Sequence, residues 1–115
     1  MGQQVPTSMP AKMELLWKNS SSGSFASQTV PLDLSGYDFI QVRFKSRMGC
    51  SPFLPIDGTT TATVSSAAKG SEVLLRSRQV CASETGVWFS QEYSLHTGSA
   101  ENTMVVPDTI YGIKL

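Results

Sequence analysis

Charged side chains are scarce in this chain. Asp, Glu, Lys and Arg make up 16% of its 115 residues, whereas about 25% is usual for soluble domains. The nine acidic and nine basic residues cancel, so the composition offers no basic surface for a nucleic acid backbone or an anionic membrane. A chain without net charge also repels its own copies weakly, which favours association.

Long apolar runs and ligand clusters are missing as well. No stretch approaches the roughly 18 apolar residues of a membrane span, and the opening MGQQVPTSMPAK lacks the basic start and apolar centre of a secretory signal. Cys50 and Cys81 could form one bridge, but nothing in the sequence indicates an oxidising compartment, so free thiols are the favoured interpretation. Two distant cysteines and a single histidine give no recognisable metal site. We expect no metal and no cofactor.

Motifs for catalysis are also absent. His96 is the only histidine, and it falls in a segment predicted to be a loop, where an exposed residue is the favoured interpretation over a catalytic base. No serine lies in a GxSxG elbow, and neither cysteine has a sequence-local partner that would lower its pKa. The glutamates occupy expected turn or outward positions rather than a recognisable acid pair. We therefore expect that the protein is not an enzyme.

What the chain does have is alternation of apolar and polar residues. It is clearest in SGYDFIQVRFKS, where Ile40, Val42 and Phe44 point to one side and Gln41 and Arg43 to the other. Six further segments are interpreted as strands, separated by turns rich in Gly, Pro, Ser and Asn: residues 13–17, 24–34, 59–66, 71–80, 86–95 and 104–115. No window has the 3.6-residue period of a helix. The pattern predicts an all-β fold, an antiparallel, jelly-roll-like β-sandwich of about seven to eight short strands (residues 13–115), after a flexible leader (residues 1–12).

The same alternation assigns faces to the strands. Met13, Leu15 and Trp17 share one side, and Trp17 is expected to lie in the core. Pro31 predicts an edge strand or a break, because proline cannot donate to a sheet ladder. Gly112, inside the apolar closing segment MVVPDTIYGIKL, indicates a bulge or a close backbone approach.

The basic residues of two strong strands are assigned to outward positions. In residues 71–80, Val73 and Leu75 are expected inside, with Arg76 and Arg78 outside. Together with Arg43 and Lys45, these arginines would form a solvated face or, less favoured, a small anion-binding patch.

Trp88 is the most informative single residue. In GVWFSQEYSL it shares parity with Glu92 and two serines, while the other side has Val87, Phe89, Tyr93 and Leu95. A tryptophan on a polar face can anchor a subunit contact or stack against a sugar ring, or it can be covered by its own chain. The candidate binding or interface residues are Trp88, Glu92, Tyr37 and Tyr111.

Three stretches of the chain resemble a known family: MELLWKNSSSGSFASQTVPLDLSGYDFIQVRFK, GVWFSQEY and VVPDTIYGIKL. The chain from MELLW to its end is similar to a small module of structural proteins in tailed bacteriophages and prophages of Firmicutes. That family pattern has ELLW before a Ser/Asn-rich turn, then F..QT..LDLSGYD, and a last strand with P..IYGIK.

The resemblance implies a biological setting. Such modules occur in tail-fibre, baseplate or head-fibre proteins and are commonly β-rich and trimeric. We therefore expect a non-enzymatic virion protein that contacts its own copies, other virion proteins and, as an adhesion module, a host surface glycan. The family usually has a long stalk before the module. Only the leader precedes it here, which is compatible with an excised domain or a short free-standing virion protein. The alternative hypothesis is a monomeric carbohydrate-binding module that uses Trp88 with Glu92, or Tyr37 and Tyr111.

Overall fold

The protein forms two antiparallel β-sheets packed face to face. The structure, a computed structural model, describes residues 12–21, 23–45, 49–68, 74–94 and 105–115. None of these residues is in an α-helix. The predicted all-β sandwich is confirmed.

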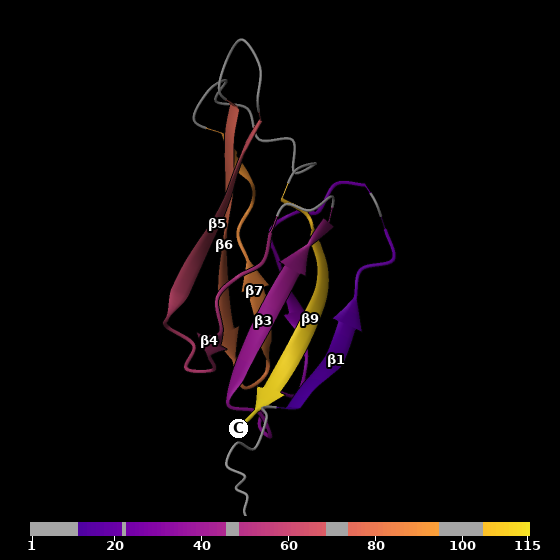
Figure 1. The fold of residues 1–115 in the computed structure, drawn as a ribbon, viewed down its shortest axis with the longest axis vertical. Coiled ribbons are helices and arrows are strands. Elements are labelled where there is room, and N and C mark those ends of the chain that lie inside the picture. Colours follow the sequence, from indigo (N-terminus) through magenta and orange to yellow (C-terminus); the bar gives the residue numbers. More distant parts are fainter. Residues whose placement is uncertain (1–11, 22, 46–48, 69–73, 95–104) are drawn as a thin grey trace, which may run out of the picture.

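Each sheet takes strands from both halves of the chain (Figure 1). The four-stranded sheet has the order β1 (Lys12–Lys18), β9 (Pro107–Lys114), β3 (Phe39–Phe44) and β4 (Leu54–Pro55). The five-stranded sheet has the order β2 (Gln28–Pro31), β7 (Gly86–Phe89), β6 (Leu74–Ser83) and β5 (Thr61–Ala68), and β8 (Tyr93–Ser94) also pairs with β6. β1 pairs with β9 and β2 with β7, so early strands meet late ones, as in the nested pairing of a jelly roll.

The closing segment of the chain is a central strand. β9 lies between β1 and β3, and both pairings are antiparallel. Side-chain atoms of Tyr37 and Leu16 pack directly against Gly112, where an added Cβ would lie 2.6 Å from Tyr37 and 2.8 Å from Leu16. The prediction of a close approach at Gly112 is confirmed. β2 ends at Pro31 and lies at an edge of its sheet, as the sequence predicted.

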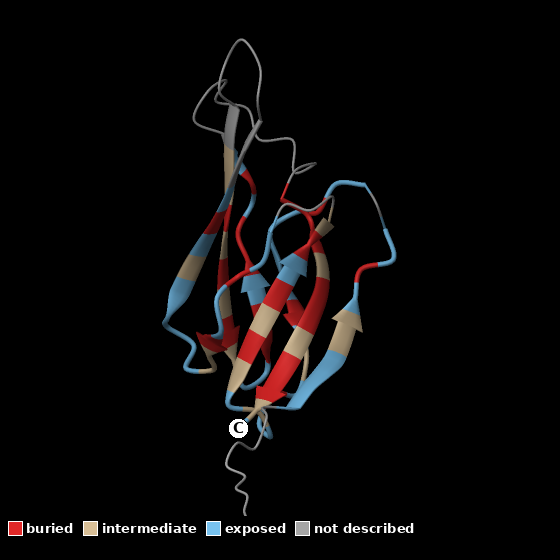
Figure 2. Cartoon of the chain, in the orientation of Figure 1, coloured by how far each residue is buried: buried red, intermediate tan, exposed pale blue. Residues whose placement is uncertain are grey.

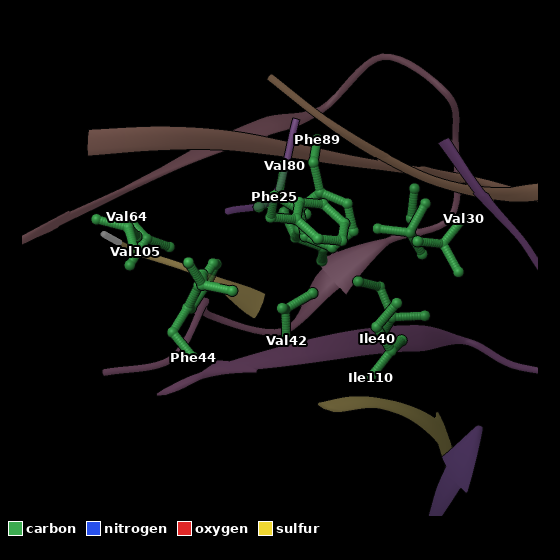
Figure 3. Packing of buried hydrophobic residues seen from close by; sticks show 14 of the residues in the cluster. Phe25, Val30, Ile40, Val42, Phe44, Val64, Val80, Phe89, Val105 and Ile110 are labelled. Carbon is green, nitrogen blue, oxygen red and sulfur yellow. The ribbon is translucent and has the colours of Figure 1, made fainter. Parts of the chain in front are cut away.

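The core fills the space between the two sheets (Figure 3). Ile40, Val42 and Phe44 of β3 all point into it, as their alternation predicted. From the opposite sheet, Phe89 packs edge-on against Phe25, with ring centroids 5.3 Å apart. The other buried apolar residues of the cluster are Val30, Leu34, Leu54, Val64, Val80, Ala82, Val87, Val105, Val106 and Ile110. Removal of this apolar surface from water is the main force that holds the sheets together.

A bulge in β1 changes the faces that its alternation predicted. Leu15 is opposite Tyr111 and Trp17 is opposite Ile110, so Leu16 has no partner residue on β9. The extra residue lets both Leu16 and Trp17 pack against the core. Trp17 was correctly expected there, but Met13 and Leu15 are exposed on the outer side of the sheet. Figure 2 shows this as an exposed stretch of β1 beside the largely buried β9.

Asp108 ties three segments together at one end of the four-stranded sheet. Its Oδ1 lies 3.2 Å from Lys45 Nζ and 3.4 Å from Lys18 Nζ. Lys45 Nζ also donates to the Asn19 carbonyl at 2.9 Å, and Asn19 donates through its backbone N–H to the Asp108 carbonyl at 2.7 Å. Burial acts to raise the pKa of Asp108, but the hydrogen bonds from Lys45 and Lys18 prevail and hold it below its ordinary value of 3.8.

This pKa shift predicts an acid-dependent stability. A carboxylate with a lowered folded-state pKa stabilises the fold fully above its unfolded pKa, and that contribution is lost as the pH falls through the folded value. Below about pH 4, the native protein should therefore lose stability more steeply than Asp108→Asn, by about 0.2–1 kcal/mol. Urea unfolding at pH 7 and pH 3 measures the difference, and parallel pH profiles for the two proteins would contradict it.

Candidate functional site

The four candidate residues lie at four separate places. Tyr37 closes one end of the sandwich. Its hydroxyl donates to Glu14 Oε2 at 2.7 Å, and Lys114 Nζ lies 4.9 Å from its ring centroid. The hydrogen bond to Glu14 raises the pKa of the Tyr37 phenol. Tyr37 thus covers Gly112 and links two strands, with its ring and its hydroxyl both in contact with other side chains.

Tyr111 lies in the middle of the outer surface of the four-stranded sheet. It is opposite Leu15 on β1 and Gln41 on β3. The guanidinium of Arg43 lies over its ring, 4.6 Å from the centroid. Tyr111 and Tyr37 therefore do not form one binding surface, since Tyr37 packs on the inward side of Gly112.

Trp88 lies on the outer surface of the other sheet. Val87 and Phe89 are buried, whereas Trp88 is 38% exposed, as its parity predicted. It is opposite Thr29 on β2 and Cys81 on β6. Trp88 and Tyr111 thus face opposite sides of the sandwich, so one flat contact cannot use both.

The prediction that Glu92 shares the face of Trp88 is wrong. Glu92 is only 1% exposed, and its Oε2 lies 3.3 Å from Arg76 Nε. Ser77 and Cys81 are four positions apart on β6, but their partners Tyr93 and Trp88 are five positions apart on the facing segment. One extra residue between β7 and β8 therefore reverses the alternation, which turns Glu92 inward.

The extra residue between β7 and β8 also turns outward a residue that the sequence interpretation placed inside. Tyr93 was expected to share the face of Val87 and Phe89, yet it is 47% exposed and lies on the outer face with Trp88. The hydrogen bonds of Ser90 mark the irregularity: its N–H donates to the Gln79 carbonyl at 3.0 Å, and its hydroxyl accepts from the Gln79 N–H at 2.9 Å. The polar SQE tripeptide between Phe89 and Tyr93 was the only sequence signal for it.

Arg78 is buried, contrary to the predicted outward position. Its exposure is 0%, and it shares the inward side of β6 with Val80 and Ala82. Its Nε donates to the Val105 carbonyl at 2.9 Å, and Nη1 donates to the carbonyls of Phe25 at 3.0 Å and Ser90 at 2.6 Å. Desolvation lowers the pKa of Arg78, and the charge of Glu92 opposes this shift. The planar guanidinium thus joins three irregular segments at the end of the core.

The four basic residues do not form the anion-binding patch that was the less favoured alternative. Arg43 and Lys45 belong to the four-stranded sheet and its continuation, whereas Arg76 and Arg78 belong to β6 of the other sheet. Arg76 pairs with Glu92, and Lys45 pairs with Asp108.

The described residues provide no assembled catalytic centre. They contain no group of three or more His, Cys, Asp and Glu side chains that could hold a metal. Both cysteines are free, with Cys50 beside β3 and Cys81 on the opposite sheet. His96 lies outside the described residues. An open depression of about 440 Å³ is lined by Pro31, Leu32, Asp33, Glu84 and Thr85, with no nucleophile and base paired in it.

Comparisons with known proteins give no relative. No protein-family model, no curated protein and no solved structure matches the chain. Within the part of the chain that the structure describes, no helix is long and apolar enough to cross a membrane. Functional inference therefore rests on the two outer faces of the sandwich.

Proposed function

We propose that this chain is a non-enzymatic structural module of a phage virion that associates with its own copies, as a trimer, through the outer face of the four-stranded sheet. The observation that supports this proposal is an apolar surface on that face. We call it the assembly face and define it by Met13, Leu15, Phe39, Phe53, Tyr111 and Ile113.

Strand register brings these side chains into rows. Met13, Ile113 and Phe39 are directly opposite one another across β1, β9 and β3. Pro55 of β4 is opposite Phe39, and the ring centroid of nearby Phe53 lies 6.3 Å from that of Phe39. The next row contains Leu15, Tyr111 and Gln41. Ile113 is fully buried yet lies outside the inner core cluster, so apolar packing extends through the sheet to its outer side.

A second copy of the chain fits this face better than a charged partner. Both rows lack charged residues, while the following row has Lys18 and Arg43 on either side of Thr109. Contiguous exposed apolar patches on soluble proteins mark interaction sites. Leu15, Phe53 and Met13 are 55%, 47% and 41% exposed, and burial of each large side chain contributes up to about 1.5–3 kcal/mol. The zero net charge removes an obstacle to self-association.

The virion setting rests on the sequence resemblance to phage structural modules. In that setting the module caps or links a fibre or baseplate, contacts other virion proteins and takes part in host adhesion. Mass spectrometry of purified particles from a strain that encodes the chain tests this setting directly.

Substitution of Leu15 by Glu is expected to dissociate the assembly. A carboxylate on the assembly face would have to be desolvated in the interface, which costs several kcal/mol. Light scattering at tens of micromolar should give the mass of a trimer for the native chain and of a monomer for Leu15→Glu.

The matched control is Thr63→Glu, which adds the same charge to an exposed position of β5 on the opposite sheet. This variant should keep the trimer mass. A monomeric native chain would overturn the assembly proposal, and so would equal dissociation by both variants.

A further inference from the structure

We infer that the outer face of the five-stranded sheet binds a neutral glycan, by stacking sugar rings on Trp88 and Tyr93. We call this surface the aromatic face. The inference goes beyond the assembly role, because it uses the opposite side of the sandwich and requires no contact between copies.

The first observation is the common orientation of the two aromatic rings. Trp88 and Tyr93 have opposite parity in the sequence and would point to opposite sides of a regular strand. The extra residue between β7 and β8 places both on the outer face, opposite Cys81 and Ser77 of the same neighbouring strand. Ser77 and Cys81 are four positions apart along β6, a distance of about 13 Å. A linear oligosaccharide can cover both rings at this spacing.

The second observation is the chemistry of the surface around the rings. One row across the sheet contains Thr61, Cys81, Trp88 and Thr29, and another contains Ser65, Ser77 and Tyr93. Thr63 and Gln79 form the row between them. Apart from the two aromatic rings, the side chains in these rows carry hydroxyl, thiol or amide groups, and none of them is charged.

This combination matches a saccharide better than other ligands. A sugar ring presents a C–H face that packs on an aromatic ring and a rim of hydroxyls that exchange hydrogen bonds with Ser, Thr and Gln. A nucleic acid would need cations for its phosphates, and the outward positions named above have none. Protein interfaces concentrate large apolar and Arg side chains at their centre, whereas the centre of this face is Gln79 and Thr63. Neutrality of the surface predicts a neutral glycan.

Glu92 does not take part in this site, although the sequence had paired it with Trp88. Its carboxylate is buried with Arg76, so Glu92 does not face the sugar. Among the described residues of the aromatic face, none is an acid positioned to cleave a bound glycan.

Affinity electrophoresis of the full chain tests the inference. The probes are four soluble neutral polysaccharides (dextran, a mixed-linkage β-glucan, a mannan and a galactan) and one anionic polysaccharide, chondroitin sulfate. At least one neutral polysaccharide should retard the native chain. Trp88→Ala and Tyr93→Ala should each weaken the interaction about tenfold or more, as loss of a stacking ring does elsewhere.

Two controls separate this site from folding and from assembly. Leu115→Ala removes a large exposed side chain that belongs to neither face, and it should leave retardation unchanged. The monomeric Leu15→Glu should still bind, and circular dichroism should show that both aromatic-face variants remain folded. The inference is overturned if no neutral polysaccharide retards the native chain or only chondroitin sulfate does. Loss of retardation in Leu115→Ala, or unchanged retardation in the two aromatic-face variants, would also overturn it.

Discussion

Deletion of residues 107–115 should abolish cooperative folding. These residues include all of β9, which has a hydrogen-bonded neighbour on each side. Their removal would leave β1 without its partner strand and take Ile110, which is fully buried, out of the core. The total free energy of unfolding of a small domain is about 5–15 kcal/mol. The loss of a central strand would cost more free energy than this total. Thermal unfolding followed by circular dichroism should show no sharp transition.

Two point variants give this prediction a graded scale. Ile110→Ala should destabilise the protein by about 2–5 kcal/mol, because it leaves a cavity between the sheets. Leu115→Ser changes the last side chain, which is 78% exposed, and should have an effect below about 0.5 kcal/mol. A truncated chain that unfolds at the native temperature would contradict the central role of β9.

Replacement of Arg78 by Met should cost about 3–5 kcal/mol of stability. The guanidinium donates to the carbonyls of Val105, Phe25 and Ser90, and methionine would leave these acceptors without that donor in a buried place. Val105 adds to the expected loss. It is β-branched and has a φ of 51°, a conformation that costs about 1–3 kcal/mol and persists only where surrounding contacts impose it.

Urea unfolding at pH 7 measures this effect, with Arg43→Met as the matched control. Arg43 is exposed and lies over the ring of Tyr111, so its loss should cost at most about 1 kcal/mol. Arg78→Lys should be nearly as unstable as Arg78→Met, because an ammonium group cannot reproduce the planar fork of donors. If Arg78→Met were as stable as the native chain, apolar packing rather than these hydrogen bonds would hold the end of the core.

The sequence predicted most of the sandwich because its strands are short and strongly patterned. β3 shows this best: Ile40, Val42 and Phe44 alternate without interruption, and all three are in the core. Pro31 marked an edge strand because the chemistry of proline leaves few other places for it. The closing strand was recognised from its apolar residues, since an unpaired apolar edge would invite aggregation.

The faces were predicted less well than the strands, and the misses in β1 and between β7 and β8 have the same physical reason. With a period of two, a single extra residue exchanges inside and outside for everything beyond it. This happened at Leu16 in β1 and between Phe89 and Tyr93, where it reversed the positions of Glu92 and Tyr93. On β6, Arg78 was placed outside because the alternation was assigned with Val73 and Leu75 inside. The carbonyls of three distant segments make its burial favourable, and pattern alone does not reveal them.

The opposed orientation of the assembly face and the aromatic face has a consequence for avidity. A chain that buries one side of the sandwich against its neighbours leaves the other side open, so a closed ring of copies would display every aromatic face at its periphery. In the proposed role in host adhesion, a surface that presents the same sugar many times would hold one face and so raise the local concentration of sugar at the next. Individually weak contacts would then combine into firm attachment, and release would require all of them to open together.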